Sequence, residues 1–311
     1  MGKRLCKLAW MLAVVLCLMT VRQPAASADS WYWLGSDAKY GKFFDPASVV
    51  VMKRAKTEHG LVATEIEAWT KTTYSYAGAA ETIETYGIKN LLPNPIKLAY
   101  SMAHVRINPQ NRTIQYLKED FYDAGGKVTW SKGEGRVKEI NSREFDEPFY
   151  AAVVDEVFRQ GEMARCLAKD RWITLWQNTS NGISTSVQAD TTTMRLRGEN
   201  LILWEWEESR NASGAVLEVK FMKKFVNLPN GTERLESGQY WSQKTGWKTL
   251  EDDMDGAYRA ISEKSPEHKG LERLQAFAKG YSTWVNRYRL HCYSFSCARG
   301  QHSRRRSAAC F

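Results

Sequence analysis

One order of short motifs occurs twice in this sequence, and no other feature constrains the fold as strongly. Each copy opens on a tryptophan-rich segment, passes through an aspartate turn into a strand that ends in tryptophan, and then has an asparagine turn and a glycine turn between aromatic residues. In chain order the paired segments are 31–36 and 171–176, 44–49 and 189–194, 66–69 and 201–206, 105–113 and 225–232, and 122–130 and 240–247. A shared order over this length predicts two tandem copies of one structural unit.

The first part of each copy has the pattern of β-structure. Segment 62–76 is rich in Thr, Ile, Trp and Tyr, and apolar residues alternate with polar ones as in a half-buried strand. The turn cluster 211–214 separates segments 201–207 and 216–226, which predicts a hairpin. The first copy alone carries an insertion, 77–97, where we expect a helical turn at 79–86 that ends at Gly87.

A helix is expected after each β portion. In the first copy Asp146-Glu147-Pro148 is a start signal, and the apolar stripe after it comprises Tyr150, Val153, Val154, Val157 and Phe158. In the second copy Ser265-Pro266 opens a longer helix, with its stripe at Leu271, Leu274, Ala278, Tyr281 and Val285. We therefore predict an α+β fold of two tandem modules, each an antiparallel β-sheet covered by a C-terminal α-helix. The alternative is that the final helix pairs with another copy of the chain.

The N-terminal segment has the pattern of a secretory signal. Three basic residues, Lys3, Arg4 and Lys7, precede the apolar run 8–19, and Ala26-Ser27-Ala28 has the small residues of a cleavage site. We predict an exported chain divided into a signal peptide (1–28), a first module (29–165), a second module (166–290) and a basic tail (291–311). No later segment is long and apolar enough for a membrane helix.

The positive charge belongs to the two ends of the chain. Of the 44 Lys and Arg residues, eight lie in segments 1–28 and 291–311, which contain no acids, so the body has 36 bases against 35 acids. A nearly neutral body with mixed signs argues against a nucleic-acid partner.

Cysteine and histidine are too sparse for a clear chemical site. After the signal, Cys166 is the one cysteine of the body, and Cys292, Cys297 and Cys310 in the tail could pair with one another or with it. The tail cysteines and histidines match no strong zinc spacing. The body histidines, His59, His104 and His268, lie in three separate elements. We therefore predict no enzymatic activity, no catalytic residue, no metal and no cofactor.

Tryptophan is the residue type that most invites a functional interpretation. Trp31, Trp33, Trp204 and Trp206 are candidates for a binding face, because aromatic side chains anchor interfaces. Trp204 and Trp206 are two residues apart on one strand and so share a face. The interpretation that we favour is that this face is the one a helix covers, which makes these rings part of a core.

The first copy resembles a known family. W-x-x-L-G-S at 31–36, F-F-D-P-A-S-V at 43–49, N-P-Q-N-R-T-I-Q-Y-L at 108–117 and Y-D-A-G-G-K-V at 122–128 are similar to the surface-adhesin protein E family of Gram-negative bacteria. The second copy, 172–247, matches more loosely. The resemblance implies an exported module of a sheet covered by a helix, located in the periplasm or at the cell surface, which in some members binds host proteins.

These observations predict an exported, non-enzymatic envelope or cell-surface protein with adhesin-like binding of a macromolecular partner. The alternative is a periplasmic structural module that self-associates through its final helix and has no adhesive role.

Overall fold

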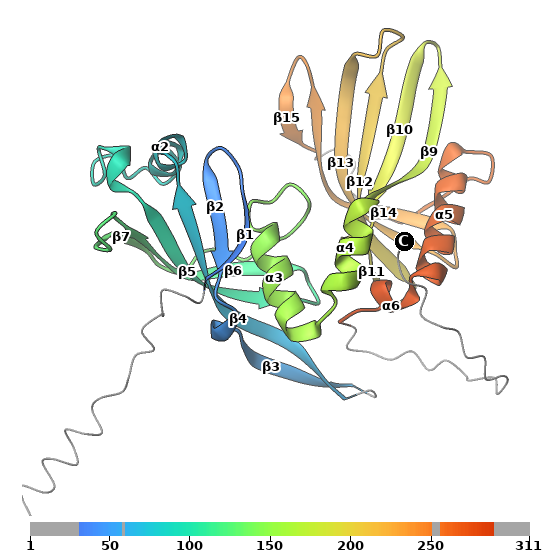
Figure 1. Ribbon diagram of the computed structural model, residues 1–311. Helices are drawn as coiled ribbons and strands as arrows, with labels where there is room; N and C mark the ends of the chain where they lie inside the picture. The colour runs from blue at the N-terminus through green and yellow to red at the C-terminus, as the bar shows by residue number, and fades with distance from the viewer. Residues whose placement is uncertain (1–30, 58–59, 251–255, 289–311) are drawn as a thin grey trace, which may run out of the picture.

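The computed structural model describes residues 31–57, 60–250 and 256–288, and these residues form two antiparallel sheets of eight strands each (Figure 1). This arrangement agrees with the predicted α+β fold of two tandem modules. The predicted signal peptide (1–28) and the whole tail (291–311) lie outside the described residues, as does His59. In the described part of the chain, no helix is long and apolar enough to cross a membrane.

The first sheet has the strand order β1-β2-β4-β5-β6-β7, while β3 pairs with β4 and β8 pairs with β6. Its strands are β1 (Tyr32–Ser36), β2 (Tyr40–Phe44), β3 (Val50–Thr57), β4 (Gly60–Tyr74), β5 (Tyr100–Asn108), β6 (Thr113–Tyr122), β7 (Val128–Lys132) and β8 (Lys138–Glu139).

The second sheet repeats this connectivity strand for strand. Its order is β9-β10-β12-β13-β14-β15, while β11 pairs with β12 and β16 pairs with β14. Its strands are β9 (Trp172–Ser180), β10 (Ile183–Asp190), β11 (Arg195–Arg197), β12 (Asn200–Arg210), β13 (Val216–Asn227), β14 (Thr232–Ser242), β15 (Gly246–Thr249) and β16 (Arg259–Ala260). The repeated motifs of the sequence therefore occupy the same places in two sheets of one topology.

The aspartate turn shows how closely the two copies agree. In the first module the turn forms the 3₁₀ helix η1 (Pro46–Ser48), and the Ser48 hydroxyl donates to the Asp45 carbonyl oxygen (2.7 Å) and accepts from the Trp69 backbone N–H (2.8 Å). This hydroxyl joins the turn to the middle of β4, and thus fixes where the chain leaves the sheet between β2 and β3.

The second module makes the same contacts with different residues. The Thr193 hydroxyl donates to the Asp190 carbonyl oxygen (2.9 Å) and accepts from the Trp204 backbone N–H (3.2 Å). A threonine can replace the serine because each supplies one hydroxyl donor and acceptor.

The asparagine turns are also equivalent. The backbone N–H groups of Asn111 and Asn230 each donate, at 3.0 Å, to the side-chain oxygen of the asparagine three residues earlier. The next residue has a positive φ in both copies, 59° at Gly231 and 52° at Arg112. Glycine adopts this conformation easily, whereas arginine does so at a cost of roughly 1–2 kcal/mol. The contacts made by the Arg112 side chain, described below, offset this cost.

In the first module the predicted helix is α3 (Glu147–Phe158), and its stripe packs on the sheet. Tyr150, Val153 and Val154 are buried against strand residues that include Ile66 and Val105. Val157 and Phe158, at the end of the predicted stripe, are partly buried against the same core.

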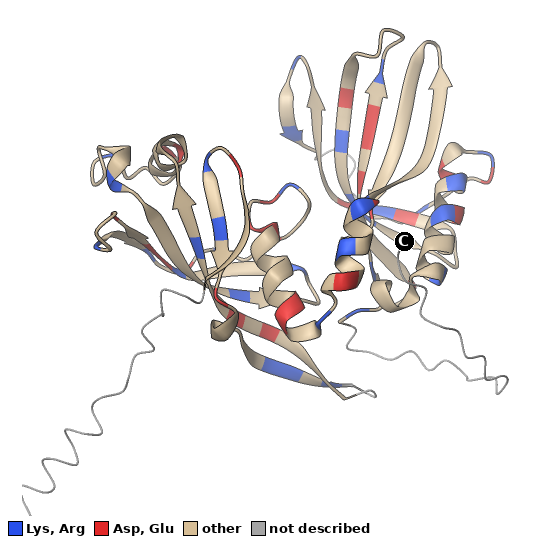
Figure 2. Ribbon diagram, viewed as in Figure 1, with Lys and Arg blue, Asp and Glu red and all other residues tan. Residues whose placement is uncertain are grey.

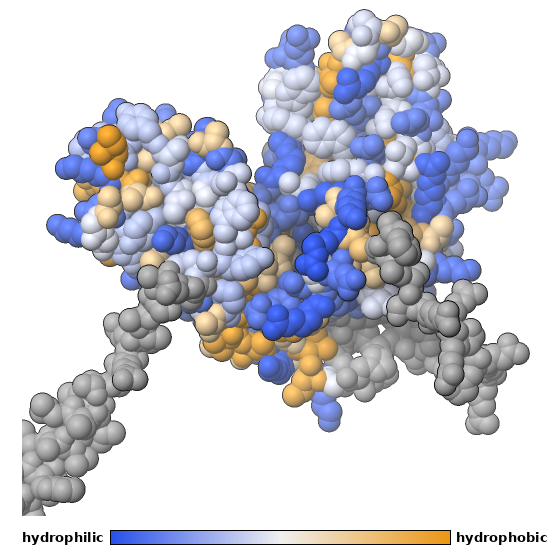
Figure 3. All heavy atoms as spheres, in the orientation of Figure 1, coloured by the Kyte–Doolittle hydropathy of each residue, from blue (hydrophilic) through white to orange (hydrophobic). Residues whose placement is uncertain are grey.

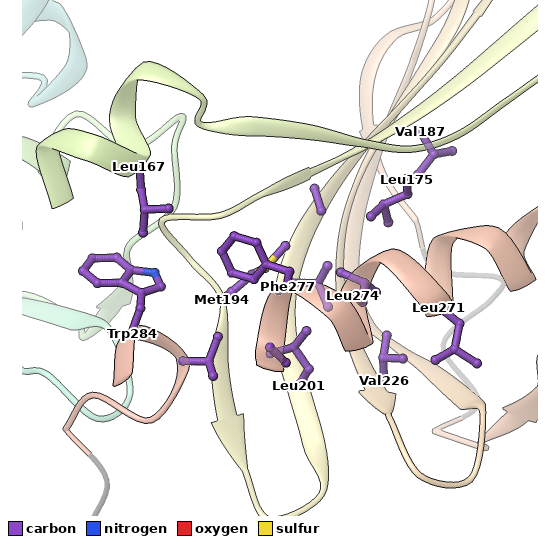
Figure 4. Close-up of a cluster of buried hydrophobic side chains, with 14 residues drawn as sticks. Leu167, Leu175, Val187, Met194, Leu201, Val226, Leu271, Leu274, Phe277 and Trp284 are labelled. Carbon is purple, nitrogen blue, oxygen red and sulfur yellow. The ribbon is translucent and has the colours of Figure 1, made fainter. Parts of the chain in front are cut away.

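The long final helix of the prediction is divided in two, which corrects one expectation. Helix α5 (Pro266–Gly280) ends before Tyr281, whose φ and ψ of −113° and 40° are not helical, and a short helix, α6 (Ser282–Val285), follows. Tyr281 is exposed, and Phe277 is buried in its place, against Leu274 and the strand residue Leu201 (Figure 4). Because the apolar face of α5 is covered by its own module, that face is not available to a second copy.

A further helix, α4 (Gly161–Lys169), joins the modules, and the predicted boundary at 165/166 falls inside it. It carries Cys166, which is disulfide-bonded. Across the junction, the Glu139 carboxylate of the first module contacts Lys223 Nζ (2.7 Å) and Arg195 Nη2 (3.3 Å) of the second. The rings of Phe158 and Tyr288 also meet there, with centroids 4.4 Å apart.

Candidate ligand-binding cleft

The insertion of the first copy builds a wall on one half of the first sheet. It contains α2 (Tyr76–Thr85) and the 3₁₀ helix η2 (Pro95–Lys97), and α2 begins three residues before the predicted turn. Its apolar residues form a separate small core with Phe121 of the sheet, made of Ala79, Ile83, Ile88, Leu92 and Leu98. In the second module the corresponding strands β12 and β13 are joined by the short turn after Arg210, so that sheet has no such wall.

A close approach of the chain holds α2 in place. A Cβ atom at Gly78 would collide with the backbone carbonyl of Lys39, in the turn between β1 and β2, so only glycine fits there. The Ser75 side chain accepts from the Gly78 backbone N–H (3.2 Å) and caps the first turn of the helix. Lys39 also pairs with Glu81 of α2 at 2.5 Å.

Between α2 and the start of α3 lies a cleft of about 540 Å³, here called the tyrosine cleft. Its volume is typical of small-molecule sites. It takes residues from the sheet, from α2 and from the segment before α3. The rings that line it belong to Tyr40, Tyr74, Tyr86, Tyr116 and Phe145.

The Glu119 carboxylate lies buried in this cleft. One of its oxygens accepts from the Ser101 hydroxyl (2.9 Å) and the other from the Tyr86 hydroxyl (3.2 Å). Ser101 in turn bonds to the Tyr74 hydroxyl (2.7 Å). Among the described residues no Lys, Arg or His nitrogen pairs with this carboxylate, and burial raises the pKa of Glu119, against the effect of its two hydrogen bonds.

A second carboxylate, that of Asp146, lies immediately before α3. One of its oxygens accepts from the Tyr116 hydroxyl (2.7 Å) and the other from Lys138 Nζ (2.8 Å). Burial raises the pKa values of Tyr74, Tyr86 and Tyr116, so these phenols keep their protons and stay hydrogen-bond donors at neutral pH.

Lysine ammonium groups lie over two of the rings that line the cleft. Lys132 Nζ is 4.4 Å from the Tyr86 ring centroid, and Lys42 Nζ is 3.8 Å from that of Phe145. Cations at such distances are attracted to ring faces. The cleft thus combines aromatic surfaces with carboxylate acceptors and with hydroxyl and ammonium donors, an arrangement suited to a polar ligand rich in hydroxyl groups.

Compared with known proteins, this chain matches no family model and no curated protein.

None of the four tryptophans predicted as a binding face lines the tyrosine cleft. Trp31 and Trp33 are in the first module, where Trp31 is half-buried with Lys71 Nζ 5.7 Å from its ring, and Trp33 is exposed on β1. Trp204 and Trp206 are in the second module, so the four residues do not form one surface of a single sheet. That they bind a partner stays a prediction.

Trp204 and Trp206 share a face of β12, as their spacing predicts, but α5 does not cover that face. Leu201 and Leu203, at the alternate positions, pack against α5. The Trp204 ring stacks instead on that of Phe221, with centroids 4.6 Å apart. The expectation that a helix covers these tryptophans is therefore wrong, because both faces of β12 are apolar and the helix packs on the leucine face.

A segment of the first module lies against these aromatic rings. The Arg143 guanidinium is 3.8 Å from the Trp247 ring centroid, and its Nη1 donates to Gln239 Oε1 (2.8 Å). Asn141, Arg143 and Trp204 line one pocket between the modules. Trp204 is 7% exposed, so a partner could stack on it only if the modules moved apart.

Proposed function

We propose that this protein is an exported, non-enzymatic envelope or cell-surface protein that binds a macromolecular partner, and that the tyrosine cleft takes a saccharide unit of that partner. The observation that carries the proposal is Glu119, a buried carboxylate that keeps acceptor capacity within an aromatic cleft. An ionised carboxylate has about four acceptor positions, and Ser101 and Tyr86 use two of them. Sugar hydroxyl groups supply the donors that the others need.

The hydrogen bonds of the two carboxylates favour binding over catalysis. Each oxygen of Glu119 and of Asp146 already accepts from a side chain of the protein, which fixes its position. Carboxylates held in this way act as rigid acceptors for a ligand.

Sequence features support the cellular part of the proposal. The signal pattern of segment 1–28 favours export, and the motifs similar to the surface-adhesin protein E family favour an envelope or surface location. In Figure 2, basic and acidic residues alternate over both modules, as expected for a protein that does not bind nucleic acid through one basic face.

A Glu119→Gln variant tests the cleft. Glutamine keeps the shape of the side chain but replaces one acceptor oxygen by a donor, so we expect saccharide binding to weaken by about tenfold or more, the equivalent of one charge-assisted hydrogen bond. The mature protein would be screened on a glycan array, and its best ligand measured by titration calorimetry. Glu272→Gln, at an exposed position of α5, is the matched control and should bind like the wild type.

Two results would contradict the proposal. Absence of saturable binding by any glycan, or equal binding by both variants, would remove the cleft as the site. Turnover of a glycan that Glu119→Gln abolishes would show instead that the protein is an enzyme, with the raised pKa of Glu119 suited to a general acid.

A self-associating envelope module is the second candidate, and the hairpin of β3 and β4 favours it. This hairpin extends beyond the rest of the first sheet (Figure 1), and apolar residues gather at that end of the module in Figure 3. Val50, Met52 and Leu61 on it are 52%, 50% and 68% exposed. Strand β3 is also an edge strand, since β4 is its one partner among the described residues, and open edges pair readily with other chains.

Sedimentation velocity over a wide range of protein concentration tests this second candidate. If the hairpin joins two copies, the wild type should dimerise, and Leu61→Lys should weaken the association by about tenfold or more, because it places a charge in an apolar contact. The control is Leu217→Lys in the second module, where the leucine is less exposed than Leu61. A monomer at all concentrations, or equal dimerisation of both variants, would exclude the hairpin.

A further inference from the structure

A second cavity, of about 500 Å³, lies where the two modules meet, and it is here called the inter-module cavity. Helices α3 and α4 form one side of it, and α6 with the chain after β10 forms another. Much of its wall is small or apolar, as shown by Leu34, Ala151, Val154, Ala164, Ala168 and Trp284. Like the tyrosine cleft, it has the volume of a ligand site.

Two buried arginines of this cavity are held mainly by backbone carbonyl oxygens. Arg112 donates from Nε to the Ile140 carbonyl oxygen (3.1 Å) and from Nη1 to that of Thr192 (3.1 Å). Arg287 donates from Nη2 to the same Thr192 oxygen (2.7 Å) and from Nη1 to the Met194 oxygen (2.6 Å). One carbonyl therefore brings together two guanidinium groups from different modules. Carbonyl oxygens fix their positions without neutralising their charge.

The guanidinium groups that line the cavity outnumber the carboxylates that line it. Its lining includes four guanidinium groups, those of Arg112, Arg165, Arg171 and Arg287, but only the two carboxylates of Glu147 and Asp155. Arg171 Nη2 is 2.6 Å from the Glu147 carboxylate and 2.9 Å from that of Asp190, whereas Arg112 Nη2 is 3.6 Å from Glu147. Burial, together with the charge of Arg112, lowers the pKa of Arg287 to about 9, as expected for a buried cation that no carboxylate of the described residues contacts.

From this juxtaposition of apolar walls and two buried arginines held by backbone carbonyls we infer a ligand site. We propose that the inter-module cavity binds an amphipathic carboxylate, with its anionic group toward Arg112 and Arg287 and its apolar body along α3, α4 and Trp284. A carboxylate matches the planar fork of arginine, and its burial is favourable only beside such positive charge. The alanines of α3 and α4 leave the space that an unbranched apolar chain would fill. The site is separate from the tyrosine cleft.

Decanoate is a suitable probe, and decanol is its uncharged analogue. Titration calorimetry on the full mature chain, below the concentration at which the probe self-associates, should show one saturable decanoate site. Decanol should bind at least about tenfold more weakly than decanoate, because it lacks the charge that the arginines attract. This comparison uses the wild-type protein and so does not depend on the folding of a variant.

A variant that closes the cavity gives the second test. Ala151 lines the cavity and is exposed on α3, so Ala151→Trp should block it and weaken decanoate binding by about tenfold or more while sparing the arginine contacts. Ala276→Trp, at an exposed position of α5, is the matched control and should bind decanoate like the wild type. Lack of saturable decanoate binding, equal affinity for decanol, or unchanged binding by Ala151→Trp would each overturn the proposal. Since none of these probes is a saccharide, failure here leaves the test of the tyrosine cleft unaffected.

Discussion

An Arg171→Met variant is expected to lose about 3–5 kcal/mol of the free energy of unfolding, because it breaks a buried ionic network that joins the modules. Arg171 Nη2 contacts Glu147 Oε1 of the first module at 2.6 Å and Asp190 Oδ2 of the second at 2.9 Å. The Asp190 side chain has no exposed surface, so without the guanidinium it would remain as a buried charge. Methionine keeps the apolar stem of arginine, so the lost free energy of unfolding measures the contribution of the guanidinium charge.

Urea denaturation followed by tryptophan fluorescence measures this effect. The control is Arg210→Met, which removes the exposed pair of Arg210 with Glu208 in β12 and should change the free energy of unfolding by no more than about 0.5–1 kcal/mol. If Arg171 joins the modules, its loss should also separate their unfolding into two transitions. Equal effects of the two substitutions would mean that the network contributes no more than a surface ion pair.

A Lys224→Met variant should be destabilised to a similar extent at pH 7, by about 3–5 kcal/mol. Lys224 Nζ lies 2.9 Å from Glu205 Oε2 and 3.1 Å from Glu233 Oε2, and Glu205 is 3% exposed. The pair lies on the face of the second sheet that also carries Leu203, since Lys224 is the cross-strand partner of Leu203. Removal of the ammonium leaves the Glu205 carboxylate buried without its nearest opposite charge.

The loss of unfolding free energy in Lys224→Met should become smaller in acid, because Glu205 becomes protonated there. Burial raises the pKa of Glu205 above its ordinary 4.5, while Lys224 lowers it, so the variant raises this pKa further. A folded protein whose acid has a raised pKa holds that proton more tightly than the unfolded chain. Its stability therefore falls as pH rises through the interval between the two pKa values, and recovers below it. The deficit should thus be smaller at pH 5 than at pH 7.

In the wild type, the titration of Lys224 itself sets a limit on stability at alkaline pH. The neighbouring acids raise the pKa of Lys224 above its ordinary 10.5, despite the opposing effect of burial. The stabilisation from its positive charge is then fully present below pH 10.5 and is lost at more alkaline pH. The control is Lys220→Met, whose partner Glu207 is 20% exposed, and it should be only slightly destabilised, with little change in acid. A deficit of Lys224→Met that is the same at pH 5 and pH 7 would contradict this account.

The sequence predicted much less of the candidate site than of the fold. Segment 77–97 was recognisable as an insertion because the second copy lacks it, and this difference is the one sequence signal that marks the tyrosine cleft. Glu119 had no distinguishing pattern, and Asp146 was recognisable only as part of a helix start signal. The two lie on β6 and before α3, and they meet the same cleft only after the sheet forms. Sequence reasoning offered tryptophans as the candidates for a binding face instead, because large aromatic residues are conspicuous whereas a single buried glutamate is not.

Local rules were enough to predict the repeated plan. The two aspartate turns and the two asparagine turns form through contacts within a few residues, and the stripe at Tyr150, Val153 and Val154 follows from the period of one helix. Only the tertiary structure decided which face of β12 is covered by α5, where the final helix ends, and that Arg112 and Arg287 meet at one carbonyl oxygen. Alternation along a strand is a property of its backbone and is therefore written in the sequence. The choice between two apolar faces depends on which distant element packs there, and no local pattern records it.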